Sequence, residues 1–239
     1  MNPLRRRIQT AMQSGGGAAA WTPASIAGLQ LWLDAAQIAG LSDGDAVSTW
    51  ADASGNANDV TQGTASSRPT YQTNELNGKP CVRFDGVDDF LRCTTFSQAQ
   101  PLTILCVSKL TETGIATRRM FDGATSRVLI GQQFAPDLLF FAGSTAPNYT
   151  GYTLPWPWRY YTGVFNGASS QQFVNGASIG TANPGTQALT DLLVGCGFYL
   201  GSPTEFWLGD IAELIIYDSS LSAGNLALLH AYIASKYGL

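Results

Sequence analysis

The sequence is poor in the residues from which most catalytic and metal sites are built. His230 is the single histidine, and the four cysteines, Cys81, Cys93, Cys106 and Cys196, occur in no CxxC or other zinc-ligand spacing. A zinc site needs several Cys or His ligands at short, regular spacings. The sequence therefore excludes a Cys/His metal centre.

Charge is also scarce, and what there is carries no basic excess. Charged residues make up 13% of the chain, and 13 Lys and Arg against 17 Asp and Glu give a formal net charge of −4. The longest apolar runs, such as 138–143 and 211–217, fall far short of the roughly 20 residues that span a bilayer. We therefore expect neither nucleic-acid binding through a basic surface nor a membrane span.

The N-terminus lacks the continuous apolar stretch of a secretory signal. Residues 1–7 are basic, but residues 8–20 (IQTAMQSGGGAAA) are interrupted by Gln, Ser and three Gly. A signal peptide needs about 7 to 15 consecutive apolar residues. We expect that the protein is not exported by that route.

The cysteines are expected to be free thiols. Cys81 and Cys93 bracket a predicted hairpin, but the alternation of side chains separates them. Cys93 falls on the apolar face with Phe84 and Leu91, whereas Cys81 shares the opposite face with Arg83. Without an export signal, reduced cysteines are also the usual state.

What the chain does contain is a series of short strand-like runs separated by turn residues. Glycine occurs 26 times and proline 11 times, and 45% of the residues are hydrophobic. Many strands at short spacing predict a sandwich or barrel. Asn175-Gly176 predicts a tight type I′ hairpin turn. The predicted strands are 29–33, 81–84, 90–94, 102–109, 127–132, 138–142, 160–165, 170–174, 192–195 and 209–217.

Alternation along these strands predicts which side chains are buried. The apolar positions that we expect between layers are Phe84, Leu91, Ile104, Val164 and Ile215.

Helical periodicity appears only at the C-terminal end. Leu226, Leu229 and Ile233 recur at spacings of three and four, Ser222 is a suitable N-cap, and Gly238 is a suitable stop. His230 lies within this predicted helix, with no acid or nucleophile near it in sequence, and we expect it to be structural.

Several blocks in succession resemble one superfamily. They are GLQLWLDA (28–35), WADASGNANDVTQ (50–62), RPTY (68–71), LNGKPCVRFDGVDDFL (76–91), WRYYTGVFNG (158–167) with QFVNG (172–176), and GDIAELIIYDSSLS (209–222). In this order they resemble the concanavalin A-like lectin/glucanase superfamily, in particular its laminin-G-like branch in bacterial and phage proteins.

The resemblance implies an all-β fold. We expect an antiparallel two-sheet jelly-roll sandwich over residues 21–239, closed by one C-terminal α-helix beginning near Ser222 and ending near Tyr237. Residues 1–20 are expected to form a separate N-terminal arm.

Three aspartates in the FDGVDDF block can serve either a turn or a metal. Asp85 can form a turn with Gly86, and Asp88 and Asp89 can accept hydrogen bonds from backbone amides of the connection, which is common turn chemistry. Clustered carboxylates also suit calcium, which some members of the superfamily bind. No EF-hand-like spacing is present, so we favour the turn, expect no cofactor, and keep calcium as the alternative.

One aromatic loop is the candidate glycan-binding site. Trp156 lies between two prolines in TLPWPW, after Tyr149 and Tyr152. Exposed aromatic rings can stack on the apolar face of a sugar. A buried loop anchor or a subunit contact is the alternative for Trp156.

Nothing in the sequence matches a catalytic template. Glucanases of the superfamily use two neighbouring acidic residues, but the glutamates, Glu75, Glu112, Glu205 and Glu213, are isolated in sequence. A Ser/His/Asp triad would have to use His230, and no GxSxG elbow occurs. We therefore expect that the protein is not an enzyme.

Two functions remain. The first is a structural component of a phage virion, such as a head decoration, fibre or tail appendage. It would form a homo-oligomer or a multi-copy assembly, assemble in the host cytoplasm and be able to contact a cell-surface glycan. The second is a bacterial extracellular carbohydrate-binding or adhesion module. The missing export signal favours the first, because virions are released by lysis.

Residues 1–20 are expected to attach the domain to other virion subunits. Arg5, Arg6 and Arg7 offer fork-shaped donors for carboxylates, and Ile8 and Met12, four residues apart, can form a short apolar stripe. The small residues from 14 to 20 would act as a hinge. A basic leader that only keeps the chain in solution is the alternative.

Overall fold

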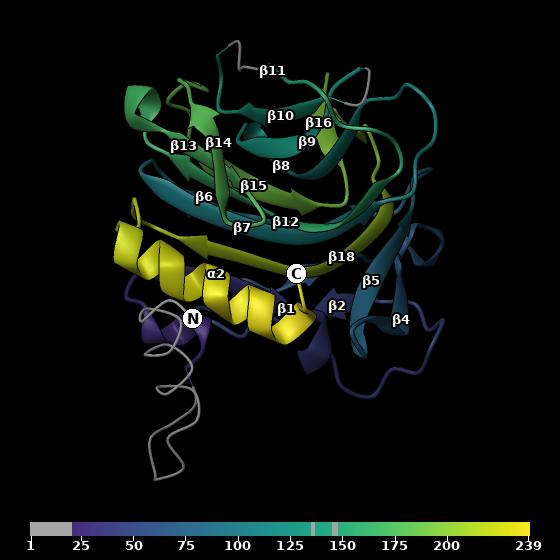
Figure 1. The fold of residues 1–239 in the computed structure, drawn as a ribbon. Coiled ribbons are helices and arrows are strands. Elements are labelled where there is room, and N and C mark those ends of the chain that lie inside the picture. The colour runs from purple at the N-terminus through teal and green to yellow at the C-terminus, as the bar shows by residue number, and fades with distance from the viewer. Residues whose placement is uncertain (1–20, 135–136, 145–147) are drawn as a thin grey trace, which may run out of the picture.

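The computed structural model describes residues 21–134, 137–144 and 148–239. Over these residues it has two antiparallel β-sheets packed face to face and one α-helix on the outside (Figure 1). The predicted all-β sandwich with a single C-terminal helix is confirmed. The predicted arm, residues 1–20, lies outside the described residues. No helix in the described part of the chain is both long and apolar enough to cross a bilayer.

Sheet A has eight strands. Seven of them follow the order β14-β13-β12-β7-β18-β5-β4, and β1 also pairs with β18. Their bounds are β1 (Leu29–Asp34), β4 (Thr70–Leu76), β5 (Lys79–Asp85), β7 (Leu102–Leu110), β12 (Trp156–Phe165), β13 (Gln171–Val174), β14 (Ala177–Thr181) and β18 (Leu208–Tyr217).

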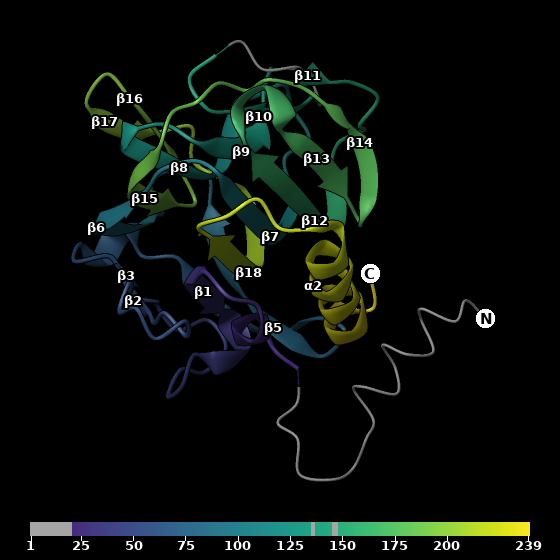
Figure 2. The ribbon, with the colours of Figure 1, turned by 90° about the vertical axis from the view of Figure 1, so that its left-hand side faces the viewer.

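Sheet B also has eight strands, in the order β11-β10-β9-β8-β15-β6-β3-β2. A separate two-stranded hairpin, β16 (Gly197–Tyr199) with β17 (Ser202–Thr204), lies next to β8 and on the far side of the molecule from the helix (Figure 2). The strands of sheet B are β2 (Thr49–Trp50), β3 (Val60–Thr61), β6 (Leu91–Gln98), β8 (Arg118–Ser126), β9 (Leu129–Gln132), β10 (Leu138–Phe141), β11 (Asn148–Tyr149) and β15 (Leu189–Val194).

The hydrophobic core has two layers. Phe84, Leu91 and Ile104 belong to the layer between the sheets, and Val164 and Ile215 belong to the layer between sheet A and the helix. All five are at most 2% exposed. The burial predicted from strand alternation is therefore confirmed.

Local signals define the ends of the helix, α2 (Ala223–Tyr237). The Ser222 hydroxyl accepts a hydrogen bond from the Asn225 amide at 3.3 Å, and Gly238 adopts the left-handed conformation with φ of 73°. These are the cap and the stop expected from the sequence.

The predicted hairpin turn is also present. Asn175 and Gly176 connect β13 to β14, with φ of 49° and 75°. Both values are positive, as a type I′ turn requires. A side chain at Gly176 would also meet the Tyr160 hydroxyl, since a Cβ there would lie 2.7 Å from it.

The four cysteines are free and buried, as expected. Cys81 lies in the layer under the helix, whereas Cys93 lies in the layer between the sheets. The side-chain alternation that separated them in sequence therefore separates them in space.

His230 is held inside the layer between α2 and sheet A. Its Nε2 lies 3.1 Å from the Thr162 hydroxyl, and its ring contacts those of Tyr160 and Phe173. Burial lowers the pKa of His230 to about 4, so the ring is neutral at neutral pH. This arrangement supports the structural role expected of His230.

A buried ion cluster ties the helix to the sheet. Glu213, in the middle of β18, is fully buried and accepts hydrogen bonds from the Trp32 indole, the Tyr232 and Tyr237 hydroxyls, and the Lys236 ammonium. The Lys236 nitrogen also contacts the Asp34 carboxylate at 2.8 Å. One carboxylate thus joins β1, β18 and α2.

We expect Lys236→Met to lower the free energy of unfolding by about 3–5 kcal/mol, because it leaves the Glu213 and Asp34 carboxylates buried without their cation. Urea unfolding of the wild type, Lys236→Met and the control Lys79→Met measures the loss. The double variant Lys236→Met/Glu213→Gln should recover part of it. A loss under about 1 kcal/mol for Lys236→Met would contradict the role of the cluster.

Candidate functional site

The tryptophan of the aromatic loop that was the candidate glycan-binding site points into the protein. Trp156 is only 1% exposed, and its ring packs against Tyr152, Tyr161 and Trp207 with centroids 5.7, 5.9 and 6.4 Å away. The prediction of an exposed Trp156 is wrong. Its position on β12, on the face of sheet A that meets sheet B, places the indole in the core.

The two tyrosines of that loop are only half-buried, but they too are engaged by the protein. The Tyr149 hydroxyl donates to the Gln172 side chain at 2.7 Å, and its ring meets Phe140 edge-on. The Tyr152 ring lies between Trp156 and the Arg159 guanidinium. These three aromatics therefore do not form an open stacking surface.

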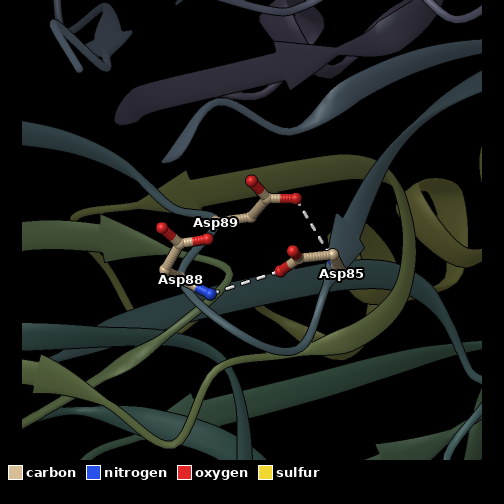
Figure 3. A group of neighbouring side chains, drawn as sticks. All are labelled: Asp85, Asp88 and Asp89. Carbon is tan, nitrogen blue, oxygen red and sulfur yellow. Dashed lines mark hydrogen bonds between the residues drawn. The ribbon is translucent and has the colours of Figure 1, made fainter. Parts of the chain in front are cut away.

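The three predicted calcium ligands do come together in a tight turn after β5 (Figure 3). Carboxylate oxygens of Asp85, Asp88 and Asp89 all lie within 4.8 Å of one another. Asp85 accepts from the Val87 and Asp88 amides, and Asp89 accepts from the Asp85 amide. The geometry is that of the turn expected from the sequence, and calcium binding stays a prediction.

Crowding affects one carboxyl of this turn in particular. Burial, together with the nearby Asp85 and Asp88 charges, raises the pKa of Asp89 to about 6, although the Asp85 amide opposes the shift. Since no ion pair within the described residues neutralises the three groups, a bound cation would relieve the repulsion.

The raised pKa of Asp89 predicts a pH-dependent stability. Between about pH 4 and 6 the Asp89 carboxyl holds a proton in the folded chain that it has released in the unfolded chain. Holding this proton adds to the free energy of unfolding. The added stability is fully present below about pH 4 and is lost as the pH rises through about 6. In the wild type we expect this effect to lower the free energy of unfolding by about 2–3 kcal/mol between pH 4 and 6, and we expect Asp89→Asn to lack that decline.

Urea unfolding at several pH values, taken as the difference between wild type and Asp89→Asn, measures this effect free of the other titrating groups. Millimolar calcium should abolish the difference if the turn binds the ion, because a bound cation keeps Asp89 ionised. Parallel pH profiles for the two proteins without calcium would contradict the raised pKa.

A second polar cluster, which the sequence did not reveal, lies on the face of sheet B that points away from the core. Arg92 on β6 and Asp122 on β8 both pair in register with Leu193 of β15, so all three side chains share that face. Their strand neighbours Leu91 and Phe121 belong to the core. Arg92 and Asp122 therefore point outward.

Two arginine–carboxylate pairs occupy this face. Arg92 binds Asp191 through Nε and Nη2 at 2.6 and 2.5 Å, and Arg127 binds Asp122 through the same two nitrogens at 2.8 and 2.5 Å. Glu205 lies 3.6 Å from the same Nη2 atom of Arg127 and also pairs with Arg119 at 2.9 Å. We call Arg92, Asp122, Arg127, Asp191 and Glu205 the sheet B site.

Burial and ion pairing have opposite effects on each pKa value in the sheet B site. Burial raises the pKa of Asp122, although the Arg127 guanidinium opposes the shift. The pKa of Arg127 is raised despite its burial, because hydrogen bonds and charge from Asp122 and charge from Glu205 favour the cation. Two carboxylates thus share one guanidinium.

Aromatic side chains border the sheet B site. The guanidinium of Arg92 lies over the Phe198 ring at 5.8 Å, and that of Arg127 over the Phe141 ring at 5.9 Å. The Phe198 amide donates to Asp122 at 3.2 Å, which attaches the β16–β17 hairpin to the site. Tyr199, the next residue in this hairpin, is 60% exposed and close enough to Arg127 to affect its pKa.

Sequence reasoning missed this site for a specific reason. Strand β8 (RRMFDGATS) does not alternate between apolar and polar residues, so it was not predicted as a strand. Glu205 reaches Arg119 and Arg127 only through sheet pairing and the β16–β17 hairpin. The glutamate that looks isolated in sequence therefore has an acidic neighbour, Asp122, in space.

Comparison with solved structures finds the same fold in proteins that act on or bind carbohydrates. Trypanosoma rangeli sialidase matches with a TM-score of 0.63 and 12% identity over 98% of this chain and 38% of the sialidase. Domain 4 of AbnA, a GH43 extracellular arabinanase from Geobacillus stearothermophilus in complex with arabinotriose, matches with a TM-score of 0.56 and 16% identity over 78% of this chain and 99% of that domain.

A third match is botulinum neurotoxin type C, whose cell entry depends on interaction with two ganglioside molecules. Its TM-score is 0.60 and its identity 14%, over 86% of this chain and 51% of the toxin chain. The chain spans less than two fifths of the length of the sialidase. No protein-family model matches the sequence, and neither does any curated protein.

These matches correct the expectation that the protein is not an enzyme. Sialidases and a domain of an arabinanase share its fold, so the lack of a catalytic pattern in the sequence does not exclude glycoside hydrolysis. The argument from isolated acids was wrong in its premise as well, because Asp122 and Glu205 both lie beside Arg127. At these identities the matches show a shared β-sandwich fold.

Proposed function

We propose that this chain is a carbohydrate-binding domain and that it holds its ligand at the sheet B site. The observation that carries the proposal is the position of Tyr199, which is 60% exposed and follows Phe198, the residue whose ring lies under Arg92 and whose amide donates to Asp122. A sugar presents an apolar face that packs on an aromatic ring and hydroxyls that suit planar, paired hydrogen-bonding groups.

Two further observations support the choice of this face. The opposite outer face, on sheet A, is covered in large part by α2 (Figure 1). The arabinanase domain of similar fold is in complex with arabinotriose, and the neurotoxin depends on gangliosides. We infer that the domain is of the concanavalin A-like, laminin-G-like type indicated by its sequence blocks.

We expect Tyr199→Ala to weaken glycan binding roughly tenfold, because one aromatic contact contributes about 1 kcal/mol or somewhat more. Its melting temperature should stay unchanged, since the side chain is mostly exposed. Screening the native domain on a glycan array and titrating the best ligand by calorimetry measures the effect. Tyr199→Phe should retain binding, and Ile115→Ala, another exposed position, is the matched control.

Two outcomes would contradict the proposal. The first is a native domain that retains no glycan. The second is glycan binding of equal strength by the native domain and Tyr199→Ala, which would move the ligand away from the sheet B site.

We also propose, from the sequence, that the domain is displayed on a phage virion and attached by residues 1–20; an extracellular bacterial module is the alternative. The basic, small-residue composition of that segment supports an attachment role. Deletion of residues 1–20 should leave a folded domain that no longer joins its particle. Normal incorporation of the truncated chain, detected by mass spectrometry of purified particles, would count against this role.

A further inference from the structure

The large apolar side chains that are exposed in the described part of the chain all come from connections at one end of the sandwich. Each of them is at least 60% exposed. They are Val87 between β5 and β6, Ile115 between β7 and β8, Phe134 after β9, and Tyr199 and Leu200 in the β16–β17 hairpin. Apolar side chains gathered in this way mark an interaction surface more often than scattered ones do.

Strand pairing shows that these connections share one end. The last residue of β5 pairs with the first residue of β18, and the last residue of β7 pairs with the second. In sheet B, the last residue of β9 pairs with the first of β8, and the last residue of β15 pairs with the first of β6. The 86–90 turn joins β5 to β6, so the ends of the two sheets coincide. We call the connections 86–90, 111–117 and 195–207 the loop end.

One arginine holds the three connections of the loop end together. The Arg118 Nη1 atom donates to the carbonyl oxygens of Gly86 and Phe206 at 2.8 and 2.7 Å, and its Nε and Nη2 atoms donate to the Glu112 carboxylate. The Phe206 ring also packs against the Phe90 ring, with centroids 6.5 Å apart. The loop end is therefore a fixed surface.

The exposed apolar side chains are attached to this framework. Val87 follows Gly86 in the turn, and Ile115 follows Gly114, whose amide donates to Glu112 at 2.8 Å. Both side chains thus lie next to residues that Arg118 and Glu112 hold in place. The apolar patch of the loop end consists of Val87, Phe90, Ile115 and Phe206.

The charge of the loop end is acidic and is not neutralised from within. Its connections contain no Lys or Arg. The carboxylates of Asp85, Asp88 and Asp89 lie together at the turn that carries Val87 (Figure 3). Every ion pair of the described residues joins other side chains. A positively charged partner is therefore attracted to this end of the molecule.

Charge separates the possible occupants of this surface. A second copy of the same surface would bring two sets of carboxylates together, and an anionic lipid surface would be repelled in the same way. The occupant that fits carries cations and apolar side chains together. Residues 5–12 of the chain itself (RRRIQTAM) are such a segment, with three arginines, two large apolar side chains and no acid.

The distribution of charge along the chain favours the same pairing. Arg5, Arg6 and Arg7 are three of the 13 Lys and Arg and precede the described residues, whereas all 17 Asp and Glu lie within them. The domain is thus more acidic than the whole chain, and the arm is its basic complement.

The arm joins the domain away from the loop end. The Trp21 ring packs on the Tyr232 ring of α2 at 5.6 Å, and the Tyr217 hydroxyl donates to the Pro23 carbonyl at 3.0 Å. Tyr217 is the last residue of β18, and the loop end lies at the first, about 30 Å away along the strand. The arm of one copy is therefore placed to meet the loop end of the next copy.

We propose that residues 5–12 of one copy bind the loop end of a neighbouring copy, so that the chain assembles head to tail. The three arginines pair with the carboxylates of the turn, and Ile8 and Met12 pack on Val87 and Ile115. A head-to-tail contact produces rings or open chains of copies. This assembly goes beyond the proposed function and requires neither a glycan nor a virion.

Sedimentation velocity of the full chain over a range of concentrations tests the assembly. The buffer contains EDTA, so that calcium cannot compete for the carboxylates. We expect oligomers whose proportion rises with protein concentration. The proportion should fall when NaCl is raised to about 0.5 M, because salt screens the pairing of arginines with carboxylates.

Two variants locate the contact. The arm variant, Arg5→Ser/Arg6→Ser/Arg7→Ser, removes the cations of the arm, and the loop-end variant, Asp85→Asn/Asp88→Asn, removes two carboxylates while keeping oxygens that accept the hydrogen bonds of the turn. Each variant should raise the Kd of association at least about tenfold.

A matched control and a replacement variant keep this comparison sound. Asp43 and Asp45 are exposed carboxylates that also accept backbone amide hydrogen bonds, so Asp43→Asn/Asp45→Asn should associate like the wild type. If the loop-end variant does not fold, as judged by its melting temperature, Ile115→Ser tests the same surface without changing the turn, since this side chain is 79% exposed.

A mixture of the arm variant and the loop-end variant separates this contact from a symmetric one. The loop-end variant keeps its arm and the arm variant keeps its loop end, so one contact can form between them. We expect a 1:1 complex that grows no further. Contacts between two loop ends or between two arms would not be restored by mixing.

Each outcome decides the inference. A wild-type chain that stays monomeric at every concentration would overturn it, even if residues 1–20 attach the chain to a particle, which is a separate proposal. A variant of the arm or the loop end that associates like the wild type, or a mixture without the 1:1 complex, would do the same. A restored 1:1 complex in a chain that binds no glycan would support the assembly and count only against the sheet B site.

Discussion

The buried carboxylate of Glu213 is the interaction on which the rest of the architecture depends. It sits in the middle of β18, where that strand pairs with β7 and β1, and accepts hydrogen bonds from β1 and from the last two turns of α2. Burial raises the pKa of Glu213, and Lys236 opposes that shift. A charge buried this deeply is tolerated only when its partners hold fixed positions, so the cluster specifies where the helix docks.

Docking of α2 makes the two outer faces of the sandwich unequal. Leu229, Ile233 and Tyr237 bury the apolar part of the outer face of sheet A. Beyond the helix, that face carries an ion network in which Arg83 and Lys109 each pair with Asp210 and Glu75, so that two cations meet two carboxylates. Within the described residues no α-helix covers the outer face of sheet B, and the β16–β17 hairpin, which carries the exposed Tyr199, packs beside β8.

Charge pairing also sets the character of the proposed sheet B site. In the sheet B site every arginine has a carboxylate, which leaves a nearly neutral, hydrogen-bonding surface suited to an uncharged sugar.

Whatever depends on a few neighbouring residues was predictable from the sequence. The Asn175-Gly176 turn, the Ser222 cap, the Gly238 stop and the burial of positions such as Phe84 follow from backbone preference and two-residue alternation. The resemblance of several sequence blocks to the concanavalin A-like superfamily added the prediction of an antiparallel sandwich. Strands β4 and β8 escaped prediction because neither alternates between apolar and polar residues: β4 (TYQTNEL) is mostly polar, and β8 is buried on both faces over most of its length.

Only the tertiary structure decided which face each polar or aromatic side chain meets. Trp156, flanked by prolines, has the sequence of an exposed loop residue, yet β12 begins there and turns the ring into the core. Asp122 and Glu205 are far apart in the chain and meet only because the β16–β17 hairpin packs beside β8. Strand pairing and sheet packing bring such residues together, and neither leaves a trace in local sequence.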